Sequence, residues 1–126
     1  MKHVSEAVHT QSEADGLLIG KAVIRAGQFL GLKQAEVAQI IGLSAPQVSK
    51  IKDGKAPVTG KAAELSLYLI RVFRSLDAIT GGDSAVVKAW MRNDNDAVGE
   101  PPARALQTAA GLVGVMTYLD AARAPL

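Results

Sequence analysis

Apolar residues along most of the chain recur at steps of three and four, the spacing of one face of an α-helix. The first such run covers residues 17–30 and ends at Gly31. Two short runs follow at 34–41 and 45–52, then a long one at about 61–79, and later ones at 84–92, 103–109 and 112–122. No segment alternates over the length of a strand, so we predict an all-α fold.

Turn-forming residues mark the predicted helix ends. Gly42 separates the two short helices, and Ser44 offers an N-cap with Pro46 in the following first turn. Asp83 can cap the helix that begins at residue 84, and Gly111 is expected to separate the last two helices. The long helix carries apolar residues on more than one stripe, which predicts contacts with the core and with a second subunit.

The composition indicates the size of the protein and argues against several classes, including secreted and membrane-spanning proteins. The 126 residues have the length of one domain, 48% of them are hydrophobic, and none is cysteine. Residues 1–16 are polar, lack a signal-peptide run and are expected to form a flexible leader. No uncharged stretch reaches the roughly 18 to 20 residues of a membrane span. We therefore expect a soluble protein, and a reducing cytoplasm fits the absence of cysteine.

Catalytic and metal chemistry lack candidate residues. The two histidines, His3 and His9, lie in the leader with a spacing that matches no metal motif. The rest of the chain offers Ser, Lys and Asp without a histidine beside them. We therefore expect no enzyme, no metal, no cofactor and no small-molecule substrate.

The surplus of positive charge lies in the first half of the chain. The chain has a net charge of +2, while residues 33–61 alone hold five Lys against Glu36 and Asp53, a net +3. An excess of this size is usually a solvated surface, unless it lies on an element that binds nucleic acid.

Residues 34–53 have the pattern that a helix-turn-helix requires. A small residue, Ala38, stands where the second helix crosses the first, and Gly42 can take the positive φ of the turn. The apolar positions that fix the crossing angle are Val37, Leu43, Val48 and Ile51. A helical hairpin that shares these offsets by chance is the weaker alternative.

This stretch resembles the Xre/Cro/λ-repressor class of DNA-binding domains. The resemblance implies that the second helix enters the major groove of operator DNA and that the protein is a homodimer. Gln47 and Lys50 would read base edges, and Gln34 would clamp a phosphate. The full set of expected DNA contacts is Gln34, Ser44, Ala45, Pro46, Gln47, Lys50, Lys52 and Lys55. Ala45 and Pro46 stand where many relatives carry polar readers.

The last third of the chain carries a second resemblance. Trp90, Asn93, Gly99, Pro101 and the apolar run 112–119 follow an order similar to the C-terminal domain of MbcA/ParS/Xre antitoxins. Trp90 is expected to anchor the core of this unit, and the paired prolines 101–102 to start a helix. The resulting division is a leader at 1–16, a helix-turn-helix and dimerisation region at 17–80, and a toxin-binding domain at 81–126.

The second resemblance implies an antitoxin. Its partner would be a RES-domain toxin that consumes NAD, covered at its active-site cleft by the C-terminal part of the antitoxin. The expected toxin-binding residues are Tyr118, Asp120, Arg123 and Leu126. Arg123 could equally be a solvated charge at a helix C-terminus. The alternative function is a stand-alone transcriptional regulator whose C-terminal half dimerises or senses a ligand.

Overall fold

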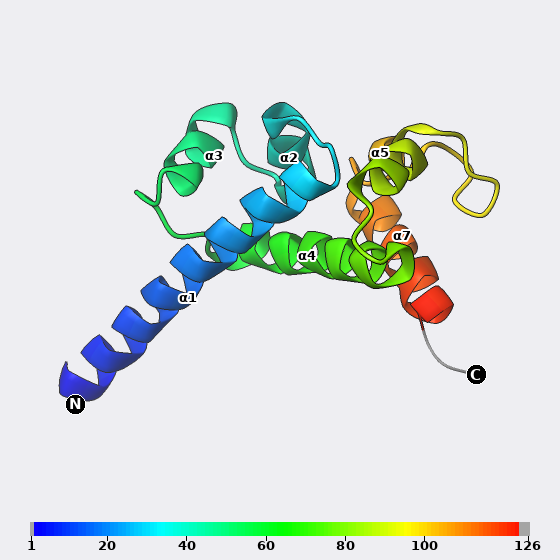
Figure 1. Ribbon diagram of the computed structural model, residues 1–126. Coiled ribbons are helices and arrows are strands. Elements are labelled where there is room, and N and C mark those ends of the chain that lie inside the picture. The colour runs from blue at the N-terminus through cyan, green and yellow to red at the C-terminus, as the bar shows by residue number, and fades with distance from the viewer. Residues whose placement is uncertain (1, 124–126) are drawn as a thin grey trace.

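A computed structural model describes the backbone of residues 2–123 and the side chains of residues 11–123. The side chains of His3, His9 and Leu126 therefore lie outside the described part. Within residues 2–123 the chain forms seven helices and no strand, which confirms the all-α prediction (Figure 1). The helices are α1 Lys2–Phe29, α2 Gln34–Ile41, α3 Ala45–Lys52, α4 Gly60–Thr80, α5 Ser84–Arg92, α6 Pro102–Ala105 and α7 Ala109–Arg123.

The first helix is longer than its apolar pattern predicts. It was expected to begin at Leu17, whereas α1 extends back to Lys2. Residues 2–15 contain neither Gly nor Pro, so the backbone can stay helical although these residues lack an apolar face. At Gly16 the helix meets the loop before α4, because the Val58 amide donates to the Gly16 carbonyl at 3.1 Å. A Cβ at Gly16 would lie 2.7 Å from Pro57 Cβ and from the Val58 carbonyl, so this crossing requires glycine.

The long helix α4 is the central element of the fold. It crosses α1 along part of its length and packs against α7 along another part (Figure 1). The short helices α2 and α3 lie on one side of α1 and α4, and α5 to α7 gather at the far end of α4. One helix therefore contributes to both halves of the chain.

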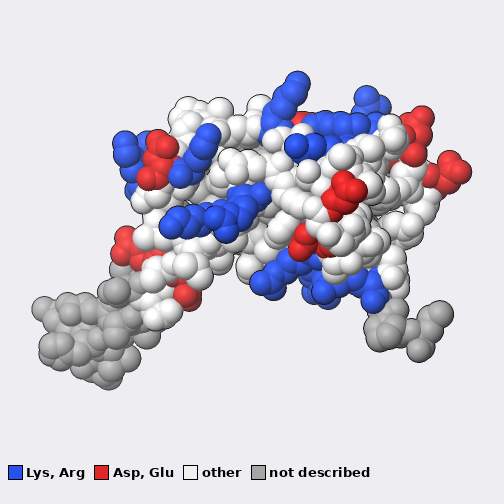
Figure 2. Space-filling model, viewed as in Figure 1, with Lys and Arg blue, Asp and Glu red and all other residues white. Residues whose placement is uncertain are grey.

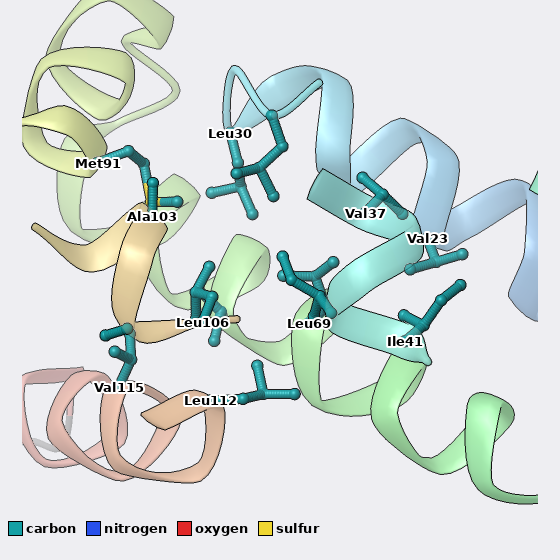
Figure 3. Close-up of a cluster of buried hydrophobic side chains, with 14 of the residues drawn as sticks. Val23, Leu30, Val37, Ile41, Leu69, Met91, Ala103, Leu106, Leu112 and Val115 are labelled. Atoms are coloured by element: carbon teal, nitrogen blue, oxygen red, sulfur yellow. The ribbon is translucent and has the colours of Figure 1, made fainter. Parts of the chain in front are cut away.

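The hydrophobic core is continuous across the two halves. Leu30 and Val37 from the first half and Leu106 and Leu112 from the second belong to the same buried cluster, with Leu69 of α4 among them (Figure 3). Each of these side chains is at most 3% exposed. Full burial of one such side chain contributes roughly 1.5 to 3 kcal/mol.

The anchor of the C-terminal half differs from the expected one. Trp90 is half-buried at the edge of the core, while Met91 and Val87 of α5 are fully buried. The helix turns Met91 inward together with Val87, four residues earlier on the same face. Trp90 precedes Met91 by one residue, so its side chain points towards the edge of this face. The position on the helix, and not the size of the side chain, therefore determines which residue is buried.

The last two helices also have different bounds from those predicted. The helix α6 has only four residues, and α7 begins at Ala109, so Gly111 lies inside α7 and does not separate helices. A Cβ at Gly111 would overlap the Ala105 carbonyl. This glycine therefore permits the close approach of α6 to the first turn of α7. The prolines start α6 as expected, with Pro101 at the N-cap and Pro102 in the first turn.

Among the described helices, none combines the length and the apolar character that a bilayer crossing needs.

Candidate functional site

The turn between α2 and α3 has the geometry that its residues predict. Gly42 adopts φ 75° and ψ 32°, the left-handed region that glycine enters without strain. The next amide, of Leu43, donates to the Ala38 carbonyl at 3.0 Å and closes the turn. Ala38 is buried, so its small side chain lets the two helices approach.

The start of α3 is held by a reciprocal capping box. The backbone amide of Gln47 donates to Ser44 Oγ at 3.3 Å, and the backbone amide of Ser44 donates to the side-chain Oε1 of Gln47 at 2.8 Å. Pro46 lies in the first turn, where its missing N–H has no helical partner to lose. Val48 and Ile51 anchor the opposite face of α3 in the protein interior.

The outer face of α3 and its surroundings bring the predicted DNA contacts together. All eight of these residues are exposed. Gln34 Nε2 donates to Ser49 Oγ at 3.1 Å, which ties the start of α2 to the middle of α3. Gln34 and Lys52 also line one small pocket with Gln28 of α1. Gln28 and Ser49 were not among the predicted residues of this surface. Their positions next to Gln34 depend on how α1 and α3 pack against α2, which the local sequence does not determine.

The cap changes what Gln47 can do in a base contact. Bidentate binding to adenine requires its Oε1 to accept and its Nε2 to donate. Because Oε1 already accepts the Ser44 amide, it must accept a second hydrogen bond or leave the cap. A carbonyl oxygen has two lone pairs, so both routes are chemically open. Lys50 lies beside Gln47 along a groove that also includes Thr59, a residue absent from the predicted DNA contacts.

The predicted toxin-binding residues of α7 divide between two faces. Asp120 pairs with Arg71 of α4 at 2.8 Å, and Arg123 Nη1 donates to Ser75 Oγ at 3.4 Å. These two side chains thus hold α7 against α4. Tyr118, by contrast, is 41% exposed on the outer face of the helix.

The outer face of α7 is free of charge over about three turns. Its exposed members follow each other at steps of three and four, as neighbours on one helix face do. They are Ala110, Val113, Gly114, Thr117, Tyr118 and Ala121. A Cβ at Gly114 would meet nothing within 4 Å. The packing of this chain therefore does not explain the glycine at that position.

An ion pair joins the helix-turn-helix to the C-terminal half of the chain. Arg92 of α5 donates to both carboxylate oxygens of Glu36 on α2, at 2.7 and 2.8 Å, and to the Gly31 carbonyl at 2.8 Å. These hydrogen bonds from Arg92 lower the pKa of Glu36 from 4.5 to about 2, helped by the Lys33 amide and opposed by partial burial. The carboxylate is therefore ionised at neutral pH.

No three His, Asp or Glu side chains gather within metal-binding reach in the described part of the chain.

Two helices that cross through a left-handed glycine, with a capped and exposed second helix, define a helix-turn-helix protein. Comparison with protein families identifies which family of helix-turn-helix proteins this is. Residues 9–71 match the antitoxin Xre-like helix-turn-helix domain, and residues 75–124 match the antitoxin Xre/MbcA/ParS C-terminal toxin-binding domain. The chain belongs to the Xre-type antitoxin family, and the boundary between the two matched domains falls within α4. A search of curated proteins found no match.

Proposed function

We propose that this antitoxin neutralises a RES-domain toxin that consumes NAD, by binding over its active-site cleft with the C-terminal domain. The observation that carries the proposal is the uncharged outer face of α7. Protein interfaces concentrate apolar and aromatic side chains at their centre and exclude charge there. Val113 and Tyr118, each 41% exposed, are the large side chains of this face.

The nature of the toxin rests on the family resemblance, and the docking face rests on the geometry of α7. Tyr118 remains a candidate contact because it lies on the open face. Asp120 and Arg123 are proposed to act indirectly, since their contacts with Arg71 and Ser75 fix the orientation of α7. Leu126 remains a proposed contact beyond the described residues.

Co-expression with the toxin encoded beside this protein tests the proposal. Gly114→Arg places a long cation in the middle of the α7 face without a clash inside the chain, so we expect a folded protein that no longer rescues growth. The matched control is Val86→Arg, the same side chain at an apolar residue of α5 that is 50% exposed, and it should still rescue. Circular dichroism and thermal melting establish that both variants fold.

Two results would overturn this assignment. If folded Gly114→Arg rescues as well as the unsubstituted protein, the α7 face does not bind the toxin. If the neighbouring gene encodes no RES-like protein and no toxin is neutralised, the chain acts as a stand-alone regulator.

We further propose that the protein represses its own operon as a homodimer through α3. The support is the exposed face of α3 with Gln47 and Lys50, and the lysines at its end (Figure 2). We expect the double variant Gln47→Ala/Lys50→Ala to bind operator DNA about 10- to 100-fold more weakly at fixed salt. Toxin neutralisation should be unchanged.

Fluorescence anisotropy with operator DNA measures this loss. Lys88→Ala, which removes one exposed cation from α5, is the control and should leave the affinity unchanged. A shallower salt dependence in the double variant would identify Lys50 as a phosphate contact. Equal affinities for the double variant and the unsubstituted protein would remove α3 from the DNA interface.

A further inference from the structure

The exposed stripe of α1 has an ordered arrangement of side chains around one leucine. Leu18 is 71% exposed, the largest exposure of any large apolar side chain in the described residues. A single exposed leucine is common on protein surfaces and by itself indicates nothing. The residues that share its stripe are informative, and they are Gln11, Ala14, Asp15, Lys21, Ala22 and Arg25.

These residues form a self-complementary series. Three residues before Leu18 stands Asp15, and three residues after it stands Lys21. Four residues before and after Leu18 the helix carries alanine, at Ala14 and Ala22. All are exposed, and α1 is continuous through the whole series. The acidic atoms accordingly lie on the part of α1 nearer the N-terminus, and basic atoms lie over its middle (Figure 2).

We propose that a second copy of this chain packs against this stripe, with the two α1 helices antiparallel and a two-fold axis at Leu18. A residue that lies k positions before Leu18 then faces the residue k positions after Leu18 in the other copy. Asp15 of each copy faces Lys21 of the other, and the two Leu18 side chains meet at the axis. Such a contact is isologous, as in most homodimers.

Sterics and charge both favour this arrangement. Ala14 faces Ala22 of the other copy, and small side chains allow helix axes to approach to about 8 Å. A parallel pair would instead place Asp15 against Asp15 and Lys21 against Lys21, which is repulsive. Gln11, which donates to Asp15 Oδ1 at 3.0 Å, holds the carboxylate on this stripe.

A neighbouring groove extends the same surface. It lies between α1 and α4 and has a volume of about 350 Å³. Ile70 and Phe73 of α4 form its apolar part next to Leu18, and Arg74 adds a cation to the wall. The acidic first half of the other α1 would approach this basic wall. The groove is thus complementary to the helix that the two-fold axis brings beside it.

This inference rests on the homodimer of the proposed function and locates its interface. Sedimentation of the full chain measures the dimer. Asp15→Lys should raise the dimer dissociation constant about tenfold or more, as should Lys21→Asp, because each places like charges together twice. The double variant Asp15→Lys/Lys21→Asp should restore the dimer. Glu13→Lys is the matched control, since it makes the same charge change two residues from Asp15 but off the stripe.

Cross-linking tests the register, because the chain has no cysteine of its own. Leu18→Cys should cross-link to itself with a short bis-maleimide, and Glu13→Cys should not. Ala14→Cys should cross-link only when mixed with Ala22→Cys, whereas a parallel pair would link Ala14→Cys to itself.

A dimer that does not cross-link through Leu18→Cys and is not rescued by the charge swap would overturn the α1 interface while leaving the homodimer intact. A monomer would overturn both. If Asp15→Lys abolishes toxin rescue with the dimer unchanged, the stripe binds the toxin and the inference is wrong. Toxin neutralisation and operator binding are judged by their own variants in each case.

Discussion

Breaking the ion pair between Glu36 and Arg92 should uncouple α5 from the helix-turn-helix at a measurable cost. Glu36→Gln keeps an oxygen that can still accept the Lys33 amide, which Glu36 accepts at 2.9 Å, so the cap of α2 survives. Arg92→Gln removes the guanidinium. Combining both substitutions completes a double-mutant cycle, which cancels the separate loss of the Arg92 bond to Gly31.

The size of the coupling follows from the pKa of Glu36. Its fall from 4.5 to about 2 sets a ceiling of about 3.5 kcal/mol, since one pKa unit equals about 1.4 kcal/mol. The Arg92 side chain is 44% exposed and that of Glu36 is 23% exposed, so water and salt screen the pair. We therefore expect a coupling free energy of about 1 to 2 kcal/mol at pH 7.

The pH dependence has a defined sign. Because folding lowers the pKa of Glu36, its contribution is complete above about pH 5 and is lost as the pH falls towards 2. The stability gap between the unsubstituted protein and Glu36→Gln should narrow over that range. Urea unfolding of the four proteins at pH 7 and pH 3 measures it. A coupling below about 0.3 kcal/mol at pH 7, or one that is equal at both pH values, would refute the reasoning.

Three further predictions concern the packing of the C-terminal half, and thermal or urea unfolding checks each of them. Gly111→Ala should destabilise the protein by about 2 kcal/mol or more, because its Cβ would overlap the Ala105 carbonyl, whereas Gly114→Ala on the same helix should stabilise it by up to about 1 kcal/mol. Equal effects at the two glycines would contradict the close contact of α6 with α7. Leu112→Ala should cost about 3 kcal/mol because Leu112 is fully buried, and a loss below about 1 kcal/mol would place it outside the core. Asp83→Ala should lower the free energy of unfolding by about 1 kcal/mol, since the carboxylate accepts hydrogen bonds from two backbone amides at the start of α5. An unchanged free energy of unfolding would show that Asp83 does not stabilise this helix as a cap.

Local chemistry was sufficient to predict the helix-turn-helix. The bounds of α2, α3 and α5 agree with the predicted ranges, because Gly42, Ser44 and Asp83 determine helix ends through their own backbone and cap geometry. Long-range packing decided the rest. Gly111 was predicted to end a helix, but its role is to admit the carbonyl of a neighbouring one, which no local pattern reveals.

The candidate sites divide in the same way. The expected DNA contacts lie together because they come from one motif with fixed internal geometry. On α7 the sequence could not tell which face meets α4, so Asp120 and Arg123 were grouped with Tyr118 although they point to different surroundings. The link from Arg92 to Glu36 spans 56 positions along the chain and has no signal in either segment alone.

The continuous core ties the lifetimes of both proposed activities together. Leu69 of α4 shares its buried cluster with Leu30 on one side and with Leu112 on the other. Proteolytic removal of the C-terminal helices would therefore expose the apolar interior of the DNA-binding half as well. Under the proposed function, loss of the toxin-binding domain would leave no stable repressor fragment. Degradation of this protein would then end toxin neutralisation and operon repression in a single event.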